Sequence, residues 1–210
     1  MRELILGMSM SLDGFVSGPE GQVEWVFDGD PEAIAWKLEI MWDTGLHVMG
    51  GRTFNVMAAF WPTSTLVFAP PMNLIPKAVF TRRGRAVPGA GGTATGSGGG
   101  QADAESPPAG QLQPGWESWG EAQVCGGELA GEVARLKAQD GGPIRAHGGA
   151  GFARSLLAEG LVDRLILLVH PVALGKGLPI FSDLAAPRRL ALVSSRAFPR
   201  GSVAQVYRPA

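Results

Sequence analysis

The chain has 210 residues, enough for one domain with a sizeable buried core. It carries 18 Lys and Arg against 19 Asp and Glu, a net charge of −1, so we expect no broad nucleic-acid surface. Cys125 is the single cysteine, which excludes an intrachain disulfide and a cysteine metal cluster. The N-terminus does not resemble a signal peptide and no stretch has the length of a membrane span, so we expect a cytoplasmic protein.

Short apolar runs alternate with amphipathic segments in the N-terminal half. The predicted elements are a strand at 4–10, a loop at 11–14, a helix from 31 to about 45, a strand at 47–49, a helix at 54–60 and a strand at 76–81. Asp30 followed by Pro31 is typical of a helix N-cap with proline in the first turn.

The composition changes sharply from about residue 84 to residue 115, where Gly, Ala, Pro, Ser and Gln dominate. Such a segment has too few large apolar side chains to offset the entropy lost on ordering. We therefore interpret it as a flexible insertion in a single domain that spans 1–210.

The alternation of strands and helices resumes after the insertion and ends in strands. The predicted elements are a strand at 122–125, a helix at 129–138, a strand at 144–146, a helix from 152, a strand at 163–171 and a terminal hairpin of 189–198 and 202–207. This order predicts a three-layer α/β fold with a mostly parallel sheet and an antiparallel C-terminal edge.

Three predicted strands end in segments that suit a phosphate group: 49–53 (Met-Gly-Gly-Arg-Thr), 81–83 (Thr-Arg-Arg) and 147–151 (His-Gly-Gly-Ala-Gly). Glycines let the backbone approach a ligand, and a helix N-terminus attracts negative charge. The carboxyl ends of parallel strands share one edge of a sheet, so the three segments can form one cradle. The alternatives are tight turns for the glycines and a solvated surface pair for the arginines.

Familiar motifs of other enzyme classes are missing. There is no G-x-x-x-x-G-K-[ST] loop, no G-x-G-x-x-G after the first strand and no G-x-S-x-G elbow. His47, His147 and His170 are scattered singly, so we interpret them as packed histidines and expect no metal site. What remains is a reaction whose difficult chemistry a cofactor carries.

The candidate acids each have an ordinary structural interpretation. Asp13 precedes a glycine and can be a turn residue, and Asp30 can be only the helix cap. Trp25 can be a core residue.

Together, these segments resemble the dihydrofolate reductase-like superfamily, and more closely the branch that contains the C-terminal reductase domain of RibD. The opening Leu-Ile-Leu-Gly-Met-Ser-Met-Ser-Leu-Asp-Gly-Phe-Val is similar to that branch's Ser-Leu-Asp-Gly start, and 169–181 is similar to its late strand and loop. The resemblance covers nearly the whole chain except about 84–115.

The resemblance implies a twisted, largely parallel sheet flanked by helices, an antiparallel C-terminal hairpin and NADPH as cofactor. The implied cofactor-binding residues are Gly50, Gly51, Arg52, Thr53, Thr81, Arg82, Arg83, Gly148, Gly149, Ala150, Gly151 and Phe152. The chain departs from the dihydrofolate reductase motif at Gly51, where the family has arginine, and Arg52 follows one place later. In the family, the glycine pair that corresponds to Gly148 and Gly149 is often a cis peptide.

On the substrate side, the resemblance implies Asp13 and Asp30 as the catalytic acids. Trp25 and Asp30 reproduce the tryptophan-to-acid spacing of dihydrofolate reductases, whereas Asp13 belongs to the RibD-like motif. We expect Met8, Ser9 and Trp25 to contact the substrate. No arginine after Trp61 matches the one that grips the glutamate tail of folate, which argues against folate itself.

The sequence thus predicts an NADPH-dependent reductase that transfers hydride to a small heterocycle such as a pteridine or an aminopyrimidine. The alternative is a non-catalytic protein on the same fold that binds a nucleotide or sequesters a ligand. The resemblance also implies a homodimer, for which the apolar strand 165–169 and the C-terminal hairpin are the expected contact.

Overall fold

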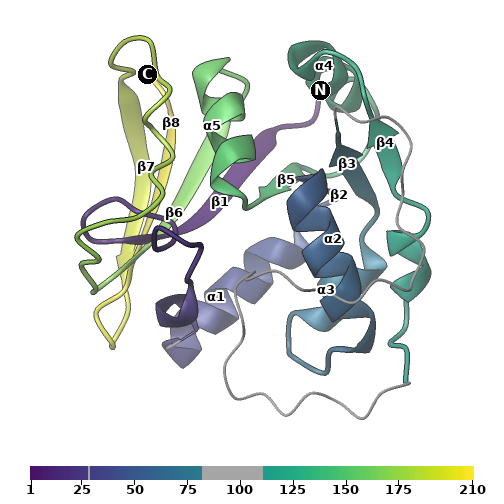
Figure 1. The fold of residues 1–210 in the computed structure, drawn as a ribbon, viewed down its shortest axis with the longest axis horizontal. Coiled ribbons are helices and arrows are strands. Elements are labelled where there is room, and N and C mark those ends of the chain that lie inside the picture. The colour runs from purple at the N-terminus through teal and green to yellow at the C-terminus, as the bar shows by residue number, and fades with distance from the viewer. Residues whose placement is uncertain (28, 82–110) are drawn as a thin grey trace.

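The computed structural model describes residues 1–27, 29–81 and 111–210, and Figure 1 shows their fold. The strands in these ranges are β1 (Leu4–Ser11), β2 (Leu46–Gly50), β3 (Lys77–Phe80), β4 (Gln123–Cys125), β5 (Ile144–His147), β6 (Arg164–His170), β7 (Leu190–Ala197) and β8 (Val203–Pro209). They form one sheet in the order β4-β3-β2-β5-β1-β6-β8-β7. Neighbours from β4 to β6 are parallel, whereas β8 is antiparallel to both β6 and β7.

Helices cover both faces of this sheet. The α-helices are α1 (Pro31–Trp42), α2 (Gly51–Phe60), α3 (Ala69–Leu74), α4 (Leu129–Lys137) and α5 (Ala150–Ala158), and the 3-10 turns are η1 (Glu24–Val26), η2 (Trp61–Thr63) and η3 (Trp116–Trp119). In Figure 1, α4 and α5 lie in the upper part of the view, α2 lies in the middle, and α1 and α3 lie in the lower part. The expected three-layer α/β fold with an antiparallel C-terminal hairpin is confirmed.

Strand alternation separates the two cores. Leu4, Leu6 and Ile144 share one face of the sheet with Val133 of α4 and Leu156 of α5. On the other face, one cluster joins Met41 of α1, Met49 of β2 and Phe54 of α2. A second cluster packs Ala33 of α1 against β6 and the C-terminal hairpin, through Leu168, Phe198 just after β7, and Ala204 of β8. Helix α1 therefore crosses the sheet from the C-terminal hairpin to β2.

The predicted elements match the observed ones closely, but four short ones were missed. Helix α3 and the turns η1, η2 and η3 have three to six residues each, too short to show a helical period in the sequence. The predicted insertion lies mostly outside the described residues. Its last part is placed, since the N–H of Gln113 donates to the carbonyl of Pro62 at 2.8 Å.

Asp30 has the predicted capping role and a tertiary one. One carboxylate oxygen accepts from the N–H of Glu32 at 2.8 Å, which caps α1, and the other accepts from the N–H of Arg200 at 2.7 Å. Arg200 lies in the turn between β7 and β8. A single side chain, 2% exposed, therefore joins the start of α1 to the C-terminal hairpin.

Within the described residues, no helix combines the length and the apolar character needed to span a bilayer.

We expect Gly45→Ala to destabilise the fold. A Cβ at this position would lie 2.7 Å from the backbone nitrogen of Gly142, and backbone cannot rotate away as a side chain can. The expected loss is about 1–3 kcal/mol of unfolding free energy, measured by urea denaturation. The matched control is Gly131→Ala inside α4, where the Cβ meets only ordinary contacts. That variant should gain about 0.5–1 kcal/mol, and an equal effect of the two changes would contradict the steric argument.

Candidate functional site

Two glycine-rich junctions, one after β2 and one after β5, lie side by side. The hydroxyl of Thr53 in α2 donates to the carbonyl of Gly148 at 3.2 Å. A Cβ at Gly149 would lie only 2.6 Å from the Thr53 hydroxyl oxygen. Segments 50–53 and 148–151 thus form one continuous surface at the carboxyl edge of the sheet, as the sequence predicts.

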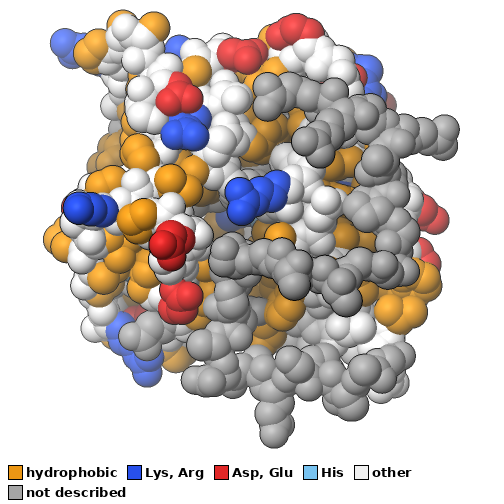
Figure 2. Space-filling model, viewed as in Figure 1, with side chains coloured by type: hydrophobic (Ala, Val, Ile, Leu, Met, Phe, Trp, Pro, Cys, Tyr) orange, Lys and Arg blue, Asp and Glu red, His pale blue; other side chains and the backbone are white. Residues whose placement is uncertain are grey.

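The helices that start at these junctions have no side-chain caps. The N-cap residues are Gly50 for α2 and Gly149 for α5, and neither offers a side chain to the first turn. By contrast, Asp30 caps α1 and Glu128 caps α4 through carboxylates. The first-turn N–H groups of α2 and α5 remain open to an external acceptor, and the helix dipoles favour an anionic one. Figure 2 shows Lys and Arg side chains on the surface at the place where α5 and α2 approach each other in projection.

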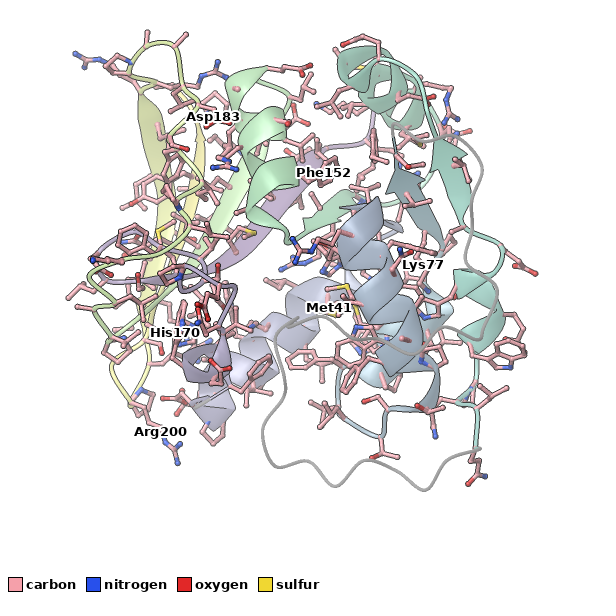
Figure 3. All side chains as sticks on the ribbon, viewed as in Figure 1. Met41, Lys77, Phe152, His170, Asp183 and Arg200 are labelled. Carbon is pink, nitrogen blue, oxygen red and sulfur yellow. The ribbon has the colours of Figure 1, made fainter. Side chains whose placement is uncertain are left out.

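Two aromatic rings pack against each other beneath the two glycine-rich junctions. Phe80 at the end of β3 and Phe152 in the first turn of α5 have ring centroids 5.1 Å apart. Figure 3 shows Phe152 near the start of α5. A Cβ at Gly50 would lie 3.4 Å from the Cβ of Phe152, an ordinary contact, so the end of β2 packs beside Phe152.

The third predicted strand end is only partly described. A Cβ at Gly51 would lie 3.7 Å from the side chain of Thr81, which places Thr81 beside the first junction. Arg82 and Arg83 lie outside the described residues. Arg52 is exposed in the first turn of α2.

The glycine pair after β5 does not adopt the cis peptide that the resemblance implies. No cis bond occurs among the described residues, so this expectation is wrong for Gly148 and Gly149. Instead, Gly149 has φ +85°, a conformation that L-residues with a side chain rarely adopt. The chain therefore turns into α5 through a positive φ.

Asp13 ties together the two segments that carry the family resemblance. Its carboxylate accepts from the Ser11 hydroxyl at 2.6 Å, from the N–H of Gly175 at 2.6 Å and from the N–H of Leu174 at 3.0 Å. These bonds, the one from Ser11 foremost, lower the pKa of Asp13 to about 2. At neutral pH this carboxylate is ionised and already holds the loop that follows β6.

The two predicted acids therefore serve different loops. Asp30 lies at the β7–β8 turn, and its bond from the N–H of Arg200 is the foremost cause that lowers its pKa.

The predicted substrate residues do not share one face of the sheet. Met8 packs against the core beneath α4 and α5, whereas Ser9 points to the opposite face, the one covered by α1, because side chains alternate along β1. Trp25 lies edge-on to His170, with ring centroids 5.3 Å apart.

Two of the histidines interpreted as single form a buried pair. Nε2 of His147 lies 2.8 Å from Nδ1 of His47, and Nε2 of His47 lies 3.2 Å from the carbonyl of Pro71. A carbonyl only accepts, so Nε2 of His47 carries its proton and its Nδ1 accepts one from His147. Strands β2 and β5 are neighbours in the sheet although about 100 residues separate the rings, so spacing in the sequence gave no signal of the pair.

Sequence reasoning also missed Arg145 and Lys37. Arg145 is a charged residue within the four-residue buried strand β5, and that contrast was the available signal. Lys37 is partly buried in the middle of α1. Electrostatics connect both residues to the histidine pair, because the charges of Arg145 and Lys37 add to the burial that lowers the pKa of His147.

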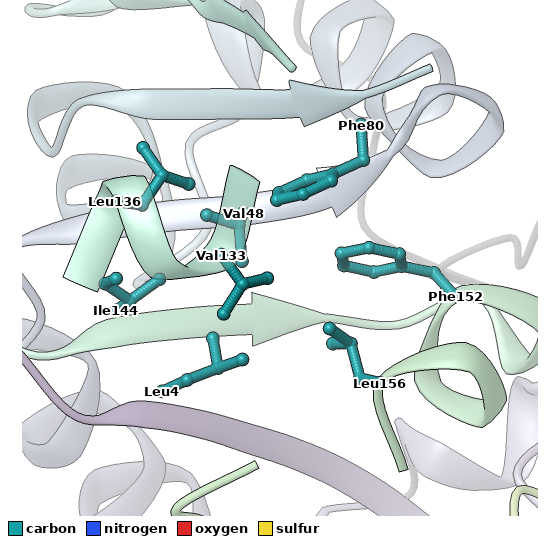
Figure 4. A pocket seen from close by; sticks show the side chains of 8 residues that line it. All are labelled: Leu4, Val48, Phe80, Val133, Leu136, Ile144, Phe152 and Leu156. Atoms are coloured by element: carbon teal, nitrogen blue, oxygen red, sulfur yellow. The ribbon is translucent and has the colours of Figure 1, made fainter. Parts of the chain in front are cut away.

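The pocket drawn in Figure 4 lies in the core beneath this site, since Phe80 and Phe152 also line it. It lies between the sheet and helices α4 and α5, with Val133, Ile144 and Leu156 among its apolar walls. It has no space that would hold a water molecule. Among the residues that the structure describes, no cluster of three His, Cys, Asp or Glu side chains could hold a metal ion.

The histidine pair predicts a loss of stability in mild acid. Burial lowers the pKa of His47 from 6.5 to about 3 and that of His147 well below 6.5. As the pH falls from 6.5 towards 3, the unfolded chain therefore binds protons that the folded chain does not. The unfolding free energy should fall by up to about 1.4 kcal/mol per pH unit for each histidine.

Urea denaturation between pH 7 and pH 5 measures this slope. The double variant His47→Leu with His147→Leu should flatten it. Part of the slope should remain, because burial also lowers the pKa of His170 to about 4. A slope unchanged in the double variant would show that the pair does not titrate as the geometry requires.

Comparison with known proteins identifies the family. Residues 2–204 match the RibD C-terminal domain. The chain is 27% identical to an uncharacterized protein, YyaP, of Bacillus subtilis over 217 aligned positions, which cover 98% of this chain and 94% of that protein.

Solved structures show the same fold. A pyrimidine reductase-like protein from Corynebacterium diphtheriae superposes with a TM-score of 0.62 at 18% identity, covering 100% of this chain and 92% of that one. Dihydrofolate reductase from Enterococcus faecalis, complexed with NADP(H), gives 0.56 at 15% identity and covers 99% and 96% of the two chains. The fold is therefore dihydrofolate reductase-like, and the chain belongs to the family of the RibD C-terminal domain.

Proposed function

We propose that this protein is an NADPH-dependent reductase that transfers hydride to a small heterocycle of the pyrimidine or pteridine type. The family is one of NAD(P)H-dependent reductases. The observation that carries the proposal is the pairing of two uncapped helix N-termini through Thr53 and Gly148. One diphosphate can accept hydrogen bonds from both.

The residues present suit a dinucleotide. Gly149 leaves free the space that a side chain would fill against Thr53, so backbone N–H groups can reach a ligand there. The first turns of α2 and α5 would hold the pyrophosphate, and we assign Thr81, Arg82 and Arg83 to the 2′-phosphate. Hydride is the chemistry that a bound nicotinamide supplies.

The contacts of the two carboxylates support positioning roles. A general acid must be protonated before it donates, whereas hydrogen bonds lower the pKa of both Asp13 and Asp30. We propose that Asp13 holds the loop after β6 in place beside the substrate, and that Asp30 fixes α1. The proton that completes the reduction after hydride transfer is then taken from solvent water, which leaves hydroxide.

The lowered pKa values of Asp13 and Asp30 also favour the alternative function, a binding protein without catalysis. A protein without a protonated acid can bind a nucleotide and a small ligand without turning them over. The two hypotheses differ in one outcome: only the reductase oxidises NADPH when a suitable heterocycle is added.

Fluorescence titration with NADPH and NADH tests the cofactor site. NADPH should bind more tightly than NADH, because NADH lacks the 2′-phosphate. Gly149→Ala should weaken NADPH binding about tenfold or more, since the new Cβ meets Thr53 and alanine resists a positive φ. Gly131→Ala, far along the chain in α4, is the control and should bind like the wild type. Equal affinity of Gly149→Ala and the wild type would contradict the cradle.

The roles of the acids are separable by Asp13→Asn and Asp30→Asn. With a heterocycle that supports NADPH oxidation, Asp13→Asn should lose about tenfold in kcat while NADPH still binds, because the loop after β6 is less firmly held. Asp30→Asn should lower the melting temperature and keep the turnover of the folded fraction. The opposite pattern would make Asp30 the catalytic acid. A screen of pteridines and aminopyrimidines that yields no oxidation would favour the binding protein.

A further inference from the structure

A row of basic side chains crosses the face of the sheet that α1 covers. Lys77 of β3, His47 of β2 and Arg145 of β5 occupy matching register positions. Their exposed fractions are 1%, 0% and 7%, respectively. A buried polar or charged group is costly unless it is hydrogen-bonded or paired, so each member needs a partner.

Two members of the row have partners within the protein. The ammonium group of Lys77 donates to the carbonyls of Asn73 and Ile75, at 2.9 and 2.7 Å. His47 is bonded to Pro71 and to His147. These groups are explained by the fold alone.

Arg145 has no such partner. In the described part of the chain, no acceptor is hydrogen-bonded to its guanidinium group and no carboxylate forms an ion pair with it, and its nitrogens are not among the fully enclosed unpartnered atoms, so they keep some access to solvent. Burial lowers its pKa to about 10, with no opposing charge to restore it, and the group is still cationic at neutral pH. The five N–H donors of a guanidinium are matched to a carboxylate or phosphate.

The guanidinium of Arg145 points towards the glycine-rich junction after β5, where we propose that the cofactor binds. A Cβ at Gly7 would lie 2.6 Å from Nη2 of Arg145, so glycine in β1 makes room for this group. Gly7 pairs with His147, the residue directly before Gly148. The charge therefore lies nearer to the carboxyl edge of the sheet than the α-carbon of Arg145 does.

Other polar groups lie near Arg145 or near Lys37. Lys37 of α1 is partly buried, its ammonium nitrogen lies 5.9 Å from the centroid of the Phe68 ring, and burial together with the charge of Arg145 lowers its pKa to about 8. Nε2 of His170 and Nε1 of Trp25 are buried without a hydrogen-bond partner among the described residues. His170 is also close enough to Lys37 for that charge to lower its pKa further. Figure 3 shows His170 on the side of the molecule opposite Lys77.

We propose that Arg145, assisted by Lys37, binds an oxyanion of the substrate, a carboxylate or a phosphate, beside the cofactor junction. The inference deepens the proposed function, on which it rests for the identity of the anion as part of the reduced heterocycle. It narrows the substrate to heterocycles that carry a negative group. Glycine at position 7 is then a specificity feature, since any side chain there would displace the guanidinium.

Calorimetric titration with three probes tests the proposal. Orotate and uracil share a pyrimidine ring and differ in the carboxylate, and inorganic phosphate represents the other source of an oxyanion. The wild type should bind orotate or phosphate about tenfold or more tightly than uracil. A preference for orotate that Arg145→Met abolishes identifies a ring carboxylate, and a preference for phosphate that Arg145→Met abolishes identifies a phosphate ester. Phosphate binding that survives in Arg145→Met belongs to the helix N-termini and contradicts the assignment to Arg145.

Arg145→Met should abolish that preference and, without ligand, raise the melting temperature, because it removes an unpaired buried charge and keeps most of the volume. Arg189→Met, which removes a charge from an exposed position, is the control and should change neither quantity. A lower melting temperature of Arg145→Met with unchanged preference would make Arg145 structural and overturn the proposal, as would a wild type that does not discriminate among the probes.

Titration of the same samples with NADPH separates this proposal from the proposed function. The probes need no cofactor to bind. Failure of the wild type to bind NADPH would therefore contradict the reductase and leave the oxyanion result standing. Normal NADPH binding without oxyanion preference would contradict the role of Arg145 and leave the proposed reductase standing.

Discussion

The proposed site depends above all on the close approach of two helix N-termini at the carboxyl edge of a parallel sheet. Strands β2 and β5 are hydrogen-bonded neighbours, so the chains that leave them must turn into α2 and α5 within a few ångströms of each other. Only a residue without a side chain suits Gly149, where φ is positive and Thr53 occupies the space beyond. Because glycine has no side chain, the two helix N-termini can pack closely and their backbone N–H groups stay accessible to a ligand. The close packing and the proposed cofactor site therefore have the same cause.

The carboxylates illustrate how folding and chemistry compete for the same groups. Asp13 and Asp30 each accept hydrogen bonds from backbone N–H groups of a segment far along the chain. Those bonds stabilise the ionised form and hold the C-terminal elements against β1 and α1. This anchoring is why we propose positioning roles for both side chains and look for the substrate-binding groups elsewhere.

Arg145 is one such group, and it lies in a buried strand on the face that α1 covers. The fold uses the partners of Lys77 and His47 to stabilise the joint between β2, β3 and α3. It provides none for Arg145, and a residue that costs stability in a buried strand is more readily explained by a ligand than by packing. The oxyanion proposed for Arg145 and the diphosphate proposed for the junctions would then lie on neighbouring parts of one edge, as cofactor and substrate must.

Local patterns in the sequence determined much of this. The apolar runs fixed the long strands, Asp30 with Pro31 fixed the start of α1, and the glycines marked both junctions, because each signal depends on neighbours a few residues away. The pairing of His47 with His147, the second partner of Asp30, the anchoring of Asp13 and the burial of Arg145 depended on which strands became neighbours. Only the tertiary structure decided these, because hydrogen bonds and desolvation act over a few ångströms in space, whereas the residues concerned are separated by about 100 to 170 positions in the chain.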